Sequence, residues 1–183
     1  MAKTQMRRLL ATAAVLCYAC AVVALVFLPL PGPDTRPPSQ TIQLLPFQWL
    51  ADVGTELRNH ALSLWHAFGT AAFESAAQNV LLFVPLGVFA RMLWKRGLIG
   101  TTLLGFACSL LIELTQLTAN WGTAPFEYRI FDVDDLMTNT AGAALGWIAG
   151  ALFLALRRQS AATRSAVGAE AVGHERVDLA KAR

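Results

Sequence analysis

The stretch RIFDVDDLMTNTAGAALGWIAG, residues 129–150, decides the fold because it sets charged residues directly against a long apolar run. Four charged residues precede the apolar part: Arg129, Asp132, Asp134 and Asp135. Within the run, glycine recurs at every fourth position, and small residues at this spacing let membrane helices approach each other closely. The charged residues therefore lie at the mouth of a predicted membrane span, where acidic side chains can cap the helix or form a site.

The composition of the whole chain also indicates a membrane protein. The 183 residues are 55% hydrophobic and 15% charged, and the mean hydropathy is +0.47. A soluble domain carries about 25% charged residues, so this chain is unusually apolar for its length of about one domain. Lys and Arg occur in short clusters beside apolar runs, without a basic stripe and interleaved aromatic residues. This pattern excludes nucleic acid as a partner.

Four apolar segments are each long enough to cross about 30 Å of hydrocarbon, which takes about 20 helical residues. They cover residues 9–30, 75–94, 98–117 and 136–156. The first is longer than the apolar part of a signal peptide, and no A-x-A cleavage site follows it. We therefore expect an all-α polytopic membrane protein with four transmembrane helices, the first of which is a retained anchor.

The distribution of Lys and Arg predicts the orientation of these spans. The N-terminus, the loop between the second and third spans and the C-terminal tail carry 12 of these residues, and the opposite side carries 3. Cytoplasmic loops are enriched in Lys and Arg, so both termini should be cytoplasmic. Residues 129–135 then face outward.

These boundaries divide the chain into five parts. We expect a cytoplasmic N-terminus (1–8), a first transmembrane helix (9–30), an outer loop (31–74), a core of three spans (75–156) and a disordered cytoplasmic tail (157–183). In the outer loop, apolar residues recur at steps of three and four from Leu50 to Phe68. This period predicts an amphipathic helix that lies on the outer face of the membrane.

Polar residues within the last three spans are predicted to lie at one depth. At 1.5 Å per helical residue, five of them fall within about 8 Å of the outer boundary: Asn79, Glu113, Gln116, Asp135 and Asn139. Polar groups inside a membrane are costly and by default mark a functional site. We therefore expect a polar cleft among the second, third and fourth spans, open toward the outer side.

Most of these residues also have a purely structural interpretation. Asn79 and Asn139 could bridge helices by hydrogen bonds. Asp132 could be the N-cap of the fourth span, with Asp135 in its first turn. Asp134 lies about 100° around the helix from Asp135, and we expect a plain capping or solvated charge there.

Glu113 is harder to explain by packing. A buried carboxylate must be protonated or paired, and Arg129 is the nearby cationic residue on the outer side. We expect Arg129 to pair either with Glu113 or with an anionic ligand.

Four blocks of sequence resemble the VanZ-like family of small bacterial membrane proteins, in the order that the family shows them. They are PF at 46–47, NVLLFVPLG at 79–87, SLLIELTQL at 109–117 and RIFDVDDLMTNTAGAALG at 129–146. The resemblance implies a multi-pass protein of the bacterial cytoplasmic (inner) membrane. The family's founding member is associated with low-level resistance to the glycopeptide teicoplanin, which implies a role in the cell envelope. The positions that match the family's polar pattern are Asn79, Glu113, Gln116, Arg129, Asp132, Asp135 and Asn139.

Two functions would use these residues differently. In an enzyme, the catalytic candidates are Glu113 as acid or base, with Asp132 and Asp135 as further carboxylates or as ligands of a divalent cation. The substrate-binding candidates are Arg129, which would hold a phosphate or carboxylate, and Asn79, Gln116 and Asn139. In a binding protein, the same cleft would recognise a lipid-linked or cell-wall-related molecule without chemistry.

A third function is that of an accessory or structural subunit, whose polar residues only pack against the helices of a partner. The sequence identifies no nucleophile with a nearby histidine, and it identifies no cofactor, metal or oligomeric state. The expected partners are the lipid bilayer and a lipid-linked envelope molecule.

Overall fold

The chain is described by a computed structural model over residues 2–28, 30–32 and 34–181. The elements in chain order are α1 (Ala2–Phe27), β1 (Ile42–Gln43), α2 (Gln48–Asn59), the 3-10 helix η1 (Leu64–Gly69), α3 (Ala71–Met92), α4 (Leu98–Leu117), α5 (Ala119–Gly122), β2 (Phe131–Asp132) and α6 (Val133–Lys181). In this described part, four helices are long and apolar enough to cross a membrane: α1, α3, α4 and α6. The predicted all-α polytopic membrane fold is confirmed.

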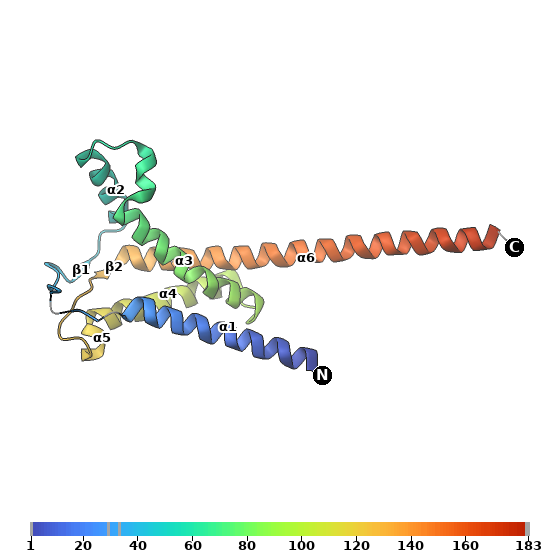
Figure 1. Ribbon diagram of the computed structural model, residues 1–183, viewed down its shortest axis with the longest axis horizontal. Coiled ribbons are helices and arrows are strands. Elements are labelled where there is room, and N and C mark those ends of the chain that lie inside the picture. Colours follow the sequence, from blue (N-terminus) through green and yellow to red (C-terminus); the bar gives the residue numbers. More distant parts are fainter. Residues whose placement is uncertain (1, 29, 33, 182–183) are drawn as a thin grey trace.

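The bundle has two different ends. The N-terminus of α1 and the turn between α3 and α4 lie at one end, which we call the terminal end (Figure 1). The segments 34–70 and 118–132, with both short strands, lie at the other, which we call the loop end (Figure 1). Helix α6 packs against α3 and α4 and extends far beyond the terminal end, whereas α1 lies at the edge of the bundle (Figure 1).

Helix α3 begins at a side-chain cap and contains a proline. The Thr70 hydroxyl accepts a hydrogen bond from the N–H of Phe73 (3.4 Å), which satisfies one of the free donors of the first turn. Pro85 lies inside the helix and has no N–H to donate. The hydroxyl of Tyr18 donates to the Leu82 carbonyl (2.9 Å), so α1 supplies a polar contact next to this interruption.

Glycine brings the backbones of α3 and α6 into direct contact. A Cβ atom on Gly142 would lie 2.2 Å from the carbonyl oxygen of Val80, and one on Gly146 would lie 2.0 Å from that of Val84. On the facing helix, a Cβ on Gly87 would lie 2.0 Å from a carbonyl oxygen of α6. Only glycine fits this approach without a shift of the backbone, so the glycine stripe is a packing face, as the sequence predicts.

The amphipathic segment is interrupted, in contrast to the single helix expected from Leu50 to Phe68. Helix α2 ends at Asn59, and Ala61 has a backbone φ of 50°, in the left-handed region that ends a right-handed helix. A second short helix, η1, follows after Ser63, whose hydroxyl lies 3.0 Å from Nδ1 of His66. The apolar period continues across this break, and periodicity alone therefore could not reveal it.

The two parts of this segment present different faces. Val53 of α2 is 8% exposed, and α2 packs against the start of α3. Trp65 of η1 is 83% exposed, and η1 leads through Thr70 directly into the membrane-spanning α3. An exposed indole at this level is typical of the boundary between membrane and water.

The structure also differs from the expectation of a disordered tail over residues 157–183. Helix α6 continues without a break from Val133 to Lys181, and residues 182–183 lie outside the described part. Residues 157–181 contain no proline and are rich in alanine, the residue with the highest helix propensity. Their polarity, from which disorder was inferred, does not oppose a helix.

Candidate functional site

The loop end is tied together by a two-stranded parallel sheet. Ile42 of β1 lies opposite Phe131 of β2, and Gln43 lies opposite Asp132. The N–H of Phe131 donates to the carbonyl of Thr41 (2.8 Å), and the Gln43 amide donates to Oδ1 of Asp132 (3.1 Å). These contacts fix the segment that precedes α6, in which the predicted acidic residues begin.

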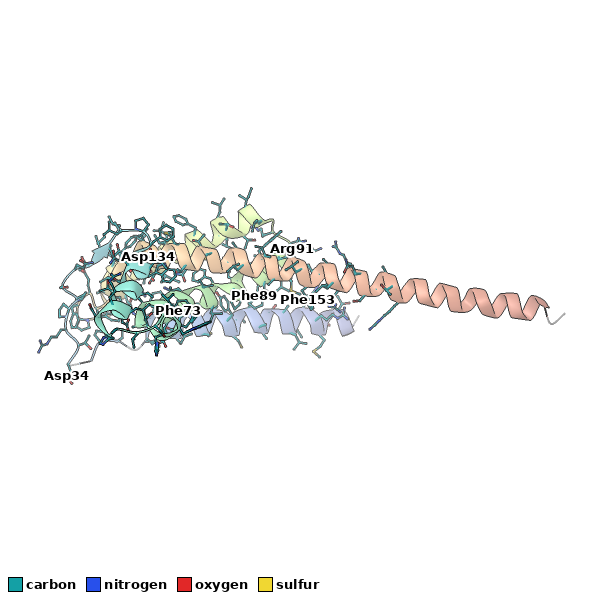
Figure 2. The ribbon with its side chains drawn as sticks, turned by 90° about the horizontal axis from the view of Figure 1, so that it is seen from above. Asp34, Phe73, Phe89, Arg91, Asp134 and Phe153 are labelled. Atoms are coloured by element: carbon teal, nitrogen blue, oxygen red, sulfur yellow. The ribbon has the colours of Figure 1, made fainter. Side chains whose placement is uncertain are left out.

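Asp134 holds α2 against the start of α6. It is 5% exposed, and its two carboxylate oxygens accept hydrogen bonds from the N–H groups of Phe47 (2.6 Å) and Trp49 (2.9 Å). Phe47 is the N-cap residue of α2, has a left-handed backbone (φ 63°) and makes no side-chain cap of its own. Asp134 is therefore not solvated, and the helix that it caps is α2 rather than its own. It lies at the loop end, away from Arg91 (Figure 2).

A cavity of about 640 Å³, which we call the membrane cavity, lies among α1, α3, α4 and α6. Six of the seven predicted site residues line it: Asn79, Glu113, Gln116, Arg129, Asp135 and Asn139. Apolar side chains from three helices line it as well: Leu25, Val26, Leu81, Leu82 and Ile112. The membrane cavity therefore combines charged, amide and hydrocarbon walls.

Asp132, the seventh predicted residue, lines a second cavity. This loop cavity has a volume of about 610 Å³ and lies between β1, α2 and the start of α6. Asp135 and Ser75 line both cavities. Burial raises the pKa of Asp132, and the negative charges of Asp134 and Asp52 raise it further, against hydrogen bonds from the Asp134 N–H and the Gln43 amide, which lower it.

Glu113 is the most deeply buried of the carboxylates. It is 1% exposed, and its Oε2 accepts a hydrogen bond from the main-chain N–H of Asp132 (3.0 Å). Within the described residues, no ion pair of 4.0 Å or less joins Glu113 to Arg129. Glu113, one of the two partners expected for Arg129, therefore does not form an ion pair with it among the described residues.

Arg129 has few interactions with the rest of the protein. Its Cζ lies 5.8 Å from the centre of the Tyr128 ring, on which the guanidinium can stack. Its Nε is buried and makes no hydrogen bond to any residue that the structure describes. A buried polar group without a partner costs about 1–3 kcal/mol, and more if it is charged.

Hydrogen bonds join α3, α4 and α6 at one level of the bundle. The Asn79 amide donates to Oδ1 of Asp135 (2.5 Å), and the Asn139 amide donates to the hydroxyl of Ser109 (2.9 Å). The Ser109 hydroxyl in turn donates to the main-chain oxygen of Asp135 (3.5 Å). Asn139 is 3% exposed, and its Oδ1 has no partner among the described residues. Asn79 thus bridges α3 and α6. Asn139 bridges α6 and α4 through its amide nitrogen only.

Gln116 holds the end of α1. Its amide donates to the carbonyl of Val26 (3.3 Å), while Asn120 and Tyr128 donate to the carbonyl of Phe27 (3.4 and 3.1 Å). The last carbonyls of a helix have no partner within it, so these three side chains complete the final turn of α1. The sequence pattern did not indicate Asn120 and Tyr128, because loop residues follow no helical period.

The described residues offer little support for a metal site or for a serine nucleophile. No group of three or more His, Cys, Asp or Glu side chains in the described part is arranged to hold a metal ion. The hydroxyl of Ser109 is fully buried and engaged in two hydrogen bonds. The arrangement can bind an anionic group through Arg129 and a hydrogen-bond donor through Asn139.

The comparison with protein families places the chain among known sequences. The VanZ/LLP1 family profile matches residues 15–154, which is more than half of the chain. No curated protein and no solved structure matches the chain significantly. The matched region extends from α1 past the glycine contacts of α6 and includes all seven predicted site residues. This protein belongs to the VanZ/LLP1 family.

Proposed function

We propose that this VanZ-like membrane protein binds a lipid-linked or cell-wall-related molecule of the bacterial envelope in the membrane cavity. The observation that carries the proposal is Arg129, which lines the cavity with a buried, unpartnered Nε. A guanidinium recognises phosphate and carboxylate groups by paired hydrogen bonds. The hydrocarbon wall of the same cavity suits a lipid chain attached to such a group.

The carboxylates of the cavity support an external partner for Arg129. Glu113 accepts its hydrogen bond from the main chain of Asp132, and Asp135 accepts one from Asn79. Neither forms an ion pair with Arg129 within the described residues. Glu113 and Asp135 thus share the cavity with Arg129 without pairing with it, which leaves the guanidinium free to pair with an anionic ligand.

The distribution of basic residues supports a site on the outer side of the cytoplasmic membrane. Residues 1–8, the α3–α4 turn and the part of α6 beyond residue 156 hold most of the Lys and Arg residues. In our proposal these parts are cytoplasmic, so the loop end and the membrane cavity face outward. A ligand of the outer leaflet would then reach Arg129 without crossing the membrane.

Recognition rather than catalysis is the function that this geometry favours. The side chain of Asp132 lines the loop cavity rather than the membrane cavity, and each predicted catalytic carboxylate already accepts a hydrogen bond from the protein. Ser109 is buried and has no free hydroxyl proton, because it donates to Asp135. No histidine or carboxylate side chain of the described residues accepts the proton of Ser109, so its hydroxyl is not an activated nucleophile.

Lipid retention tests the proposal. Purified full-length protein is incubated with phosphatidylglycerol or with phosphatidylcholine of the same acyl chains, and native mass spectrometry counts the lipids retained. Arg129→Gln should lower the retention of phosphatidylglycerol about tenfold, the effect of one charge-assisted hydrogen bond, and should not change that of phosphatidylcholine.

Arg58→Gln is the matched control, because Arg58 is an exposed arginine of α2 at the same end of the bundle and lies outside the membrane cavity. It should retain phosphatidylglycerol like the wild-type protein. Equal losses in both variants would indicate a general charge effect and would contradict the proposed site.

A cellular assay extends the test to the envelope. A strain that lacks the gene is complemented with the wild-type protein, Arg129→Gln or Arg58→Gln, and its susceptibility to teicoplanin is measured. We expect the wild-type protein and Arg58→Gln to change susceptibility and Arg129→Gln to have no effect. If Arg129→Gln acts like the wild-type protein, the cavity is not the site of this function.

A further inference from the structure

Asn139 has an unused hydrogen-bond acceptor and lies in the wall of the membrane cavity. The residue lines the cavity and is 3% exposed. Its amide nitrogen donates to Ser109 (2.9 Å), and its Oδ1 has no partner among the described residues. A buried carbonyl oxygen normally accepts at least one hydrogen bond, so this atom is suited to a donor from a ligand.

The orientation of the Asn139 side-chain amide follows from its hydrogen bond to Ser109. The Ser109 hydroxyl donates to the main-chain oxygen of Asp135 (3.5 Å) and accepts from the amide of Asn139 (2.9 Å). A flipped amide would require the Ser109 hydroxyl to donate to Asn139 instead, and its hydrogen bond to the main chain of Asp135 would be lost. The nitrogen of Asn139 therefore faces Ser109, and the oxygen is the atom that remains free.

None of the neighbouring protein donors that the structure describes is bonded to Oδ1 of Asn139. Asn79 donates to Asp135, and Gln116 donates to Val26. Glu113 accepts a hydrogen bond from the main chain and, when ionised, has no proton to give. Arg129 makes no hydrogen bond to Asn139. No described side chain of this polar group donates to Oδ1.

We propose that the molecule bound in the membrane cavity carries a hydroxyl or amide donor beside its anionic group, and that Asn139 accepts this donor. The inference rests on the proposed function, in which Arg129 holds the anionic group. It narrows the ligand class to anionic lipids with a hydroxyl or an amide close to the phosphate or carboxylate. Asn139 is then the residue that discriminates such lipids from equally charged lipids without a donor.

Three lipids with oleoyl chains and one phosphodiester charge test the inference on the full-length protein. Phosphatidylmethanol has no donor, phosphatidylglycerol has hydroxyls beyond the phosphate, and lysophosphatidylmethanol has a hydroxyl between the phosphate and the chain. The wild-type protein should retain at least one donor lipid about fivefold more strongly than phosphatidylmethanol, the effect of one hydrogen bond. Which donor lipid is preferred locates the donor relative to the phosphate.

Two variants separate the roles of Asn139 and Arg129. Asn139→Leu should retain all three lipids equally, whereas Arg129→Gln should weaken all three by the same factor. The comparison on the wild-type protein needs no variant, so it remains decisive even if Asn139→Leu does not fold.

The two proposals fail in different ways. Equal retention of the three lipids by the wild-type protein would overturn the role of Asn139 and leave anion binding intact. A donor preference that persists in Asn139→Leu would also overturn it. No retention of any anionic lipid above phosphatidylcholine would overturn the proposed function itself.

Discussion

Helices α3 and α6 meet in two ways along their length. Toward the terminal end, Gly142 and Gly146 press against the main chain of α3, and no side chain fits between the helices. Toward the loop end, Asn79 and Asp135 replace this contact with a hydrogen bond, and Asn139 leaves an acceptor free. The change from main-chain contact to hydrogen bonding occurs within about one turn of α3, since Val80 contacts Gly142 and Asn79 contacts Asp135. We call the part around Gly142 and Gly146 the glycine half and the part around Asn79, Asp135 and Asn139 the polar half. Close packing in the glycine half can hold incompletely paired polar groups in the polar half, where they are available for binding.

The glycine half should be the more sensitive to substitution. Gly146→Ala adds a Cβ that would lie 2.0 Å from the carbonyl oxygen of Val84, and a rigid backbone cannot relieve this overlap by rotation. We expect a loss of about 3 kcal/mol in stability, measured as a lower midpoint of thermal unfolding in detergent. Gly100→Ala is the control, since a Cβ there meets nothing within 4 Å, and it should not destabilise. Equal midpoints for both variants would refute the packing role.

The contact between α2 and the start of α6 depends on Asp134. Asp134→Ala removes the acceptor of two N–H groups at the start of α2, and we expect a loss of about 2 kcal/mol. Thermal unfolding and faster proteolysis within α2 would report it. Asp52→Ala, which removes an exposed carboxylate from α2, is the control and should change stability by less than about 0.5 kcal/mol. An Asp134→Ala protein as stable as this control would show that the cap does not matter.

The polar half should tolerate conservative changes yet lose function. Glu113→Gln keeps an acceptor for the N–H of Asp132, and Asp135→Asn keeps one for Asn79, so each should change stability by less than about 1 kcal/mol. Both variants should insert normally and fail to change teicoplanin susceptibility in the complemented strain. Poor insertion or degradation of Glu113→Gln and Asp135→Asn, together with Asn139→Ala, would favour a packing role for these residues.

The smallest effect concerns the pH dependence of stability. Burial raises the pKa of Asp132, so the folded protein keeps this proton to a higher pH than the unfolded chain does. Stability should therefore fall as pH rises from the ordinary aspartate pKa, about 3.9, through the raised value. Asp132→Asn should flatten this slope in thermal unfolding between about pH 3.5 and 7. Identical slopes in the two proteins would contradict the assignment.

The features that could be predicted from the sequence are those that depend on the pattern of residues within a single helix. Apolar length predicted four membrane-spanning helices, and the spacing of glycine predicted the face that α6 presents to α3. The depth of each polar residue along its own helix placed Asn79, Glu113 and Asn139 at one level, and the structure places all three around one cavity. Their roles in binding remain predictions.

What the sequence could not predict are contacts between distant segments. The contact between Phe47 and Asp134 spans 87 residues, and no helical period connects a loop to the start of another helix. The same reason explains why Asp132 was grouped with Glu113, although its side chain lines the other cavity. Glu113 was one of two partners expected for Arg129, the other being an anionic ligand, and the described residues show no ion pair between Glu113 and Arg129.

An experimental structure of the protein purified with lipid from its native membrane would test the central claim most directly. The account predicts density inside the membrane cavity, with an anionic group against Arg129 and a donor within hydrogen-bond distance of Oδ1 of Asn139. The opposite result is a cavity that contains no such density and an Arg129 side chain paired with Glu113 or Asp135. In that case the polar half of the bundle is a second packing interface, and the contrast with the glycine half disappears.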